Sequence, residues 1–208
     1  MNKPYANLPL IVLLPVLALL SVACSTSPPT RFYVLSNLSR PSPTVTETAQ
    51  EIAVGVGPMV LPEYLDRPQI ITRTGQNELN LAEFDRWGEA LKDNANQVLA
   101  ENLAVLLPSK KVHTFPWKRS TKIDYQVTVK VTRFDYTDGG ETALQVRWSI
   151  LSGEGNTELM SRESRYTERP DGPGYSAIVA AMNRALAKFS RDVAYALRTQ
   201  ANEALPLP

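Results

Sequence analysis

Alternating apolar and polar residues, the two-residue period of a half-buried β-strand, occur in two segments in the second half of the chain. The two segments are 123–136 and 143–150, and residues 157–169 can supply a third strand after them. Glycine-containing turns separate them, and the first turn holds Asp138-Gly139, a pair typical of tight hairpins. The pattern therefore predicts an antiparallel meander over residues 123–167.

Two other stretches carry apolar residues at the three- and four-residue spacing of an amphipathic helix. The first runs over 84–107, with Phe84 and Trp87 expected one turn apart on its core face, and Pro108 ends it. The second runs over 175–198, after a proline- and glycine-rich break at 170–174. Each helix would bury one apolar stripe against a sheet.

Shorter strand signals precede these segments. They are 31–36, 51–61, 68–73 and 77–82. No internal repeat and no second domain boundary is visible, and the tail 201–208 is expected to be frayed. The pattern predicts an α+β fold in a single domain, with a mainly antiparallel β-sheet and two long amphipathic helices packed on one face.

The N-terminus has the layout of a secretory signal peptide. Lys3 is followed by an apolar run over 8–20 and then by small residues up to Ala23. The apolar run is shorter than the roughly 20 residues that cross a bilayer as a helix. We therefore expect residues 1–23 to be removed.

Cys24 is the only cysteine, so no disulfide can form within the chain. The segment Leu-Ser-Val-Ala-Cys, residues 20–24, resembles the lipobox of bacterial lipoproteins, in which the cysteine is acylated and becomes the mature N-terminus. Ser25 after it favours sorting to the outer membrane by the same resemblance. Residues 24–50 would then hold the lipidated cysteine, a tether and the first strand. The alternative is an ordinary signal peptide with a chance cysteine near its cut.

Charge and residue types restrict the function. Lys3 is the only charged residue before Cys24, so the mature chain carries no net charge and has no electrostatic footprint for nucleic acid. One histidine, His113, cannot supply the usual zinc sets, and neither a G-x-S-x-G elbow nor a phosphate-binding loop is present. We expect no enzyme, no metal and no cofactor.

The segment 56–73, VGPMVLPEYLDRPQIITR, concentrates prolines, charges and aromatic character between two strand signals. Its carboxylates Glu63 and Asp66 could in principle act in catalysis, but solvated charges or ion pairs with Arg67 and Arg73 are the simpler interpretation. Four apolar residues of the segment are packing candidates: Leu61, Leu65, Ile70 and Ile71.

A basic cluster with interleaved aromatic residues occupies 109–122. Its cations are Lys110, Lys111, Lys118, Arg119 and Lys122, and its aromatic residues are Phe115 and Trp117. The cluster could contact anionic head groups or a partner, or it could be a solvated loop between a helix and a strand.

Taken together, the lipobox, FYVL at 32–35, GPMVLPEYLDRPQIITR at 57–73 and AEFDRWGEAL at 82–91 resemble the PqiC/YmbA-like lipoproteins. These are the auxiliary lipoprotein component of ABC-type MCE transport systems, the paraquat-inducible family. The resemblance covers nearly all of the mature chain and implies an auxiliary lipoprotein domain over 51–200. Gly88 stands where the family pattern has alanine, a minor departure.

The resemblance implies a lipid-anchored protein of the outer membrane of a Gram-negative bacterium, facing the periplasm. Its partner would be an MCE-domain protein of the same system, and together they would move lipid between membranes and support envelope integrity. A ring-forming partner also leaves a homo-oligomer open. An alternative function is an assembly factor for outer-membrane lipopolysaccharide or barrel proteins.

Within this family context, the 61–73 segment is our candidate for partner docking or self-assembly. Pro62 and Pro68 within it and Pro58 just before it restrict it before any partner binds, and tyrosine and arginine are enriched at binding hot spots. The candidate partner-binding residues are Glu63, Tyr64, Asp66, Arg67 and Arg73. An internal ion-pair role is the alternative for the same residues.

Overall fold

The computed structural model describes residues 27–38, 51–107, 109, 111–155 and 157–203. The predicted signal peptide 1–23, the predicted lipidation site Cys24 and the end of the predicted tail, 204–208, lie outside the described residues.

The elements follow one another in an α+β order, as the sequence predicts. They are β1 (Arg31–Tyr33), β2 (Val54–Val60), the 3-10 helix η1 (Glu63–Leu65), β3 (Gln69–Arg73), β4 (Leu79–Trp87), α2 (Leu91–Leu106), β5 (Val112–Thr114), β6 (Tyr125–Thr137), β7 (Thr142–Ser152), β8 (Glu158–Glu168) and α3 (Tyr175–Glu203). Within the described residues, the eight strands form one sheet in a single domain.

Strand β6 is the centre of the sheet. Along one edge it pairs antiparallel with β7, which pairs antiparallel with β8, so the predicted meander is confirmed. Its other edge pairs parallel with β2 over its first half and parallel with β3 over its last two residues. The outer strands β1, β4 and β5 complete the order β1-β4-β3-β6-β2-β5. The sheet is therefore mixed, because β1, β2, β3 and β5 add parallel pairs that alternation alone does not indicate.

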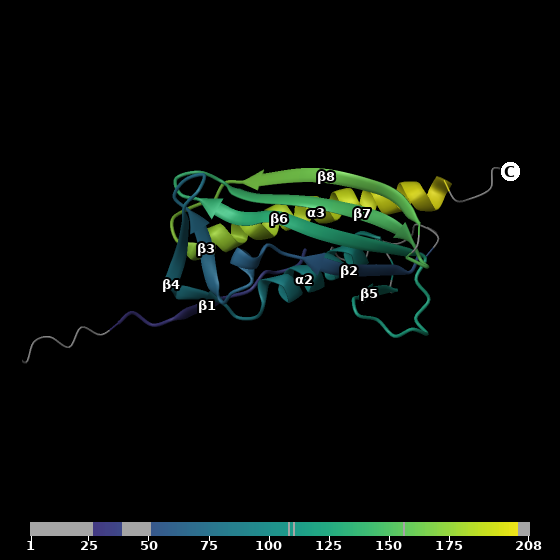
Figure 1. Ribbon diagram of the computed structural model, residues 1–208, viewed down its shortest axis with the longest axis horizontal. Helices are drawn as coiled ribbons and strands as arrows, with labels where there is room; N and C mark the ends of the chain where they lie inside the picture. The colour runs from purple at the N-terminus through teal and green to yellow at the C-terminus, as the bar shows by residue number, and fades with distance from the viewer. Residues whose placement is uncertain (1–26, 39–50, 108, 110, 156, 204–208) are drawn as a thin grey trace, which may run out of the picture.

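Both helices pack against the sheet and against each other. Helix α3 contacts β6, β7 and β8, while α2 contacts β2 and β5 (Figure 1). Phe189 of α3 meets Trp148 of β7 edge to face, with ring centroids 5.8 Å apart, and both side chains are fully buried. Such aromatic pairs stabilise a core beyond the area that they bury. Neither helix of the described chain is long and apolar enough to cross a membrane.

The start of the first helix differs from the prediction. Phe84 and Trp87 lie in β4, not on the first turn of a helix, and α2 begins only at Leu91. Their three-residue spacing imitates a helix, but Trp87 pairs with Tyr33 of β1 and donates its backbone N–H to Pro68. Tertiary pairing thus overrides a local pattern. At the other end, α3 extends to Glu203, three residues into the predicted tail.

Candidate docking site

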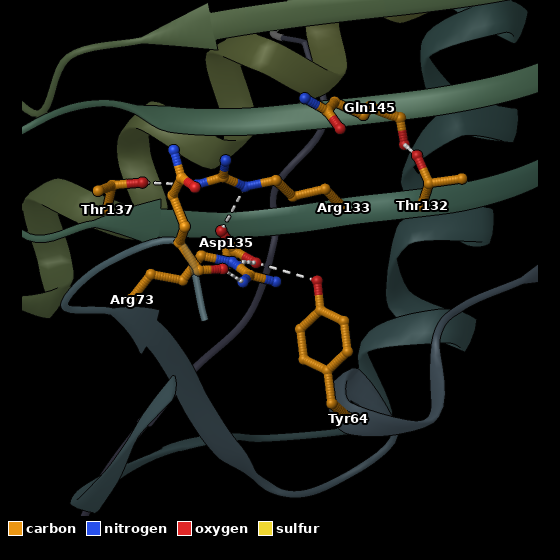
Figure 2. A network of polar contacts seen from close by, with 8 residues as sticks. Tyr64, Arg73, Thr132, Arg133, Asp135, Thr137 and Gln145 are labelled. Atoms are coloured by element: carbon orange, nitrogen blue, oxygen red, sulfur yellow. Dashed lines mark hydrogen bonds and ion pairs between the residues drawn. The ribbon is translucent and has the colours of Figure 1, made fainter. Parts of the chain in front are cut away.

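A fully buried carboxylate, that of Asp135 on β6, is the centre of the polar network behind the 63–73 segment. It accepts hydrogen bonds from Nε of Arg73 at 2.8 Å, Nε of Arg133 at 2.7 Å and the hydroxyl of Tyr64 at 3.0 Å. Figure 2 shows these side chains converging on Asp135 from η1, β3 and β6. A buried charge is tolerated when it is paired and hydrogen-bonded in this way.

An irregularity in the pairing of β6 with β7 turns the side chain of Asp135 toward this network. Val131 pairs with Val146 and Arg133 with Gln145, so one extra residue, Thr132, stands on β6 between the two pairs. Such a bulge moves the following side chains to the opposite face of the sheet. The sequence carries this signal, because the alternation of apolar residues that runs to Val131 resumes at Phe134 rather than at Arg133.

Arg73 and Tyr64 support each other as well as Asp135. The guanidinium carbon of Arg73 lies 5.3 Å from the centroid of the Tyr64 ring, and Nη1 donates to the backbone carbonyl of Gln76. Burial raises the pKa of the Tyr64 hydroxyl, and the neighbouring Asp135 carboxylate adds to this rise. Burial alone would lower the pKa of Arg73, but its contacts with Asp135 and Tyr64 together outweigh burial and raise it.

The 3-10 helix η1 is fastened at its buried residue, Leu65, which is 3% exposed. Its N–H donates to the carbonyl of Pro62, and the N–H of Asp66 donates to the carbonyl of Glu63. Tyr64 and Leu65 therefore point into the domain while the polar residues beside them stay outside. The segment is held before any partner binds.

Glu63, Asp66 and Arg67 are exposed. Among the described residues they form neither an ion pair nor a side-chain hydrogen bond. Asp66 and Arg67 line a groove of about 370 Å³ whose other wall is the turn 87–90 before α2. The N–H of Trp87 donates to the carbonyl of Pro68 at 2.7 Å, and this hydrogen bond joins the turn to the 63–73 segment.

The structure thus divides the five candidate partner-binding residues. Tyr64 and Arg73 make internal contacts, and the ion pair of Arg73 is with Asp135 rather than with Glu63 or Asp66. Glu63, Asp66 and Arg67 remain available at the surface. Of the predicted packing residues, Leu65, Ile70 and Ile71 are buried and Leu61 packs against the core.

A second buried carboxylate, Asp85 on β4, fixes the first strand beside this groove. It accepts from the guanidinium of Arg31 at 2.9 Å and from the hydroxyl of Tyr33 at 2.7 Å. Gly88 donates its N–H to the carbonyl of Tyr33, which joins β1 to the groove wall. Sequence reasoning did not place Asp85 or Asp135 in networks, because their partners other than Arg133 are 52 or more residues away in the chain.

The carboxylates of this site differ in their surroundings. Asp85 and Asp135 are held by arginine and tyrosine side chains, whereas the carboxylates of Asp66 and Glu89 both line the groove. Within the described residues, no group of three or more His, Cys, Asp or Glu side chains could hold a metal ion. What the site presents is an ordered, charged rim.

Residues 33–194 match the family model described as the ABC-type transport auxiliary lipoprotein component. This chain belongs to that family. A solved structure of a Xanthomonas campestris protein is 15% identical, with a TM-score of 0.66 over 85% of this chain and 100% of that chain. Another solved protein, described as uncharacterized, is 17% identical, with a TM-score of 0.66 over 82% of this chain and 99% of the other. No curated protein sequence matches the chain.

Membership confirms the expected resemblance at the level of the family. This auxiliary lipoprotein component of transport systems is membrane-anchored in a Gram-negative envelope and works with partners. The two solved structures share its fold. The matched range begins at Tyr33, the last residue of β1, and β1 pairs with β4 of the sheet.

Proposed function

We propose that this chain is the outer-membrane-anchored lipoprotein subunit of an MCE-type lipid transport system, facing the periplasm. In this role it acts as a docking component and not as an enzyme. Family membership supports a transport role. The lipobox-like segment before Cys24 supports the anchor, and Ser25 supports sorting to the outer membrane.

The observation that carries the proposal is the division within the 63–73 segment. Tyr64, Leu65 and Arg73 fix the loop from inside, whereas Asp66 and Arg67 lie on the rim of a groove and pair with no side chain in the described part of the chain. A pre-ordered loop loses less entropy on binding than a loop that must be ordered by its partner. Rim charges steer association and select partners more than they add affinity.

The partner that we propose for this rim is the MCE-domain protein of the same system. Glu63, Asp66 and Arg67 would contact it directly, while Tyr64 and Arg73 would act by holding the loop in place. Self-association through the same rim, giving a homo-oligomer, is compatible with this use. No catalytic step is assigned to any residue.

Affinity purification of the lipidated protein from its own membranes tests the proposal. We expect the protein to sediment with outer membranes in a density gradient and to bring down an MCE-domain protein in mild detergent. Recovery of lipopolysaccharide- or barrel-assembly proteins in place of an MCE-domain protein would contradict the proposal and favour an assembly factor. Sedimentation with inner membranes would contradict the assigned location.

A further inference from the structure

A loop distant from the candidate docking site combines exposed cations with an exposed aromatic ring. Residues 115–124, here named the basic crossover loop, connect β5 to β6. Both of these strands pair parallel with β2, one on each side of it. The loop must therefore return past the end of β2 to start the next parallel strand.

The loop packs closely against β2 because Gly55 has no side chain. The ring of Trp117 lies over Gly55 so closely that a Cβ at that position would stand 2.7 Å from it. The N–H of Phe115 donates to the carbonyl of Val56 at 2.9 Å, and the N–H of Thr121 donates to the carbonyl of Lys118 at 2.8 Å. These contacts fix both the start and the turn of the loop.

Three cations project from this fixed loop. Lys118, Arg119 and Lys122 are exposed, and none of them forms an ion pair or a side-chain hydrogen bond with any other described residue. The one carboxylate of the loop, that of Asp124, accepts the N–H of Ala53 at 2.7 Å and keeps its negative charge. The loop therefore carries three cations against one carboxylate and has a net positive charge.

An aromatic ring borders these cations. The side chain of Phe115 is 48% exposed, and its ring meets that of Trp117 edge to face, with centroids 5.5 Å apart. Aromatic residues and arginine are enriched at protein interfaces, where an ordered ring gives contact area at little entropic cost. Charge and apolar area thus occur together on one fixed loop.

The loop lies at the end of the domain opposite to the N-terminal strand that follows the proposed lipid anchor. The described chain begins at Ser27, three residues after Cys24, and enters the domain at β1. Three residues span about 10 Å at most. Figure 1 shows β1 at one end of the long axis and the loop between β5 and β6 at the opposite end. The anchored bilayer is therefore at the other end of the domain.

We propose that the basic crossover loop is a docking surface for an acidic segment of a partner protein. Lys118, Arg119 and Lys122 would attract and orient the acidic side chains, and Phe115 would supply the apolar contact beside them. The choice of a protein over a bilayer rests on the lipid anchor of the proposed function, but the inference does not rest on the proposed transport partner, since an acidic partner other than an MCE-domain protein would satisfy it. The surface is also separate from the groove beside Asp66 and Arg67.

A bilayer fits the loop less well than a protein does. Anionic lipid attracts a basic segment only within about a Debye length of the membrane surface, roughly 8 Å at physiological ionic strength. The loop lies at the end of the domain remote from its own anchor. Three cations on a chain with no net charge after removal of residues 1–23 also fall short of the broad basic face that nucleic acid requires.

Site-specific photo-crosslinking of the full-length protein in its own membranes tests the proposal. A photoreactive amino acid replaces exposed Ser120 in the loop, and a control replaces exposed Arg165 on β8. We expect a protein adduct from position 120 and none from position 165, with the crosslinked peptide rich in Asp and Glu. The triple variant K118E/R119E/K122E should lower the adduct at least ten-fold. Reversing the acidic residues of the crosslinked peptide should restore it.

The matched control variant is K130E/R162E/R165E, which makes the same change of charge on exposed residues of β6 and β8. It should leave the adduct unchanged, and both variants should melt at the temperature of the wild type. Adducts to phospholipid, adducts to a second copy of this chain, or no adduct at all would each overturn the proposal. An adduct that is insensitive to charge reversal in the loop would overturn it as well.

Discussion

Tyr64 donates its hydroxyl to Asp135, 71 residues later in the chain, at 3.0 Å. This one contact joins the surface segment η1 to the central strand β6. It explains how a loop rich in prolines and charges can be ordered without being buried. The residues that a partner could touch depend on a carboxylate that no partner can reach, since Asp135 is fully buried.

Replacing Asp135 by asparagine should therefore destabilise the domain strongly. Arg73 and Arg133 would keep their charges, with side chains only 18% and 22% exposed, and would lose the carboxylate between them. Removing one member of a buried ion pair costs about 3 kcal/mol or more in the free energy of unfolding. Urea denaturation measures this loss.

The controls for this prediction are a milder change in the same network and a change outside it. Tyr64→Phe removes one hydrogen bond and should cost about 1 kcal/mol. Exposed Asp138→Asn should change the free energy of unfolding by less than about 0.5 kcal/mol. Equal stability of Asp135→Asn and Asp138→Asn would show that the network does not hold the fold.

The contact of Trp117 with Gly55 gives a second prediction, on the basic crossover loop. Gly55→Ala would place a methyl group 2.7 Å from the indole ring, so the ring must move outward. Overpacking of this kind costs about 1–3 kcal/mol. We expect a red-shifted tryptophan emission and lower stability, whereas Gly75→Ala, with no atom near its Cβ, should show neither. An unshifted spectrum for Gly55→Ala would contradict the observed packing.

Stability at acidic pH should depend on Glu168, which joins β8 to α3. Hydrogen bonds from Lys188 and then Arg184 lower the pKa of this carboxyl below its ordinary value of 4.5, although burial opposes them. Its contribution is therefore complete above pH 4.5 and is lost as the pH falls through the folded-state pKa. The free energy of unfolding of the wild type should exceed that of Glu168→Gln by about 0.5–1 kcal/mol at pH 7. The difference is small because the two cations are partly exposed.

Chemical denaturation of both proteins from pH 7 down to pH 2.5 measures this difference. The difference in the free energy of unfolding should shrink once the pH passes below 4.5. A constant difference across this range would mean that Glu168 stabilises the domain through packing and not through its charge.

The anchor itself gives the fourth prediction. Cys24→Ala removes the only thiol that could be acylated, and the described helices offer no membrane span in its place. The variant should appear in the soluble periplasmic fraction with an unchanged melting temperature, while the wild type remains in membranes. Retention of the variant in washed membranes would contradict lipidation as the means of attachment.

The sequence predicted those elements whose own periodicity is strong. The meander over 123–167 and the second helix follow from local alternation, glycine-containing turns and helical spacing, so β6, β7, β8 and α3 lie where the sequence predicts them. The three-residue spacing of Phe84 and Trp87 predicts a helix, but the same spacing also occurs by chance in a strand. Only the pairing of Trp87 with Tyr33, far apart in the chain, decides between the two.

The candidate site shows the same limit. The 63–73 segment could be singled out by its composition, but composition does not separate Arg73, which holds the loop, from Arg67, which is exposed. That distinction depends on a carboxylate placed by a bulge on another strand. The break in alternation between Val131 and Phe134 is the one local sign of it.

The central claim is that the displayed charges of this segment dock an MCE-domain partner, and the double charge reversal D66K/R67E tests it most directly. Both residues are exposed and unpaired among the described residues, so the variant should keep the circular dichroism spectrum and melting temperature of the wild type. The measurement is the amount of MCE-domain protein that co-purifies with each lipidated protein from membranes. We expect at least a ten-fold loss with D66K/R67E. A folded variant that brings down as much MCE-domain protein as the wild type would contradict the account.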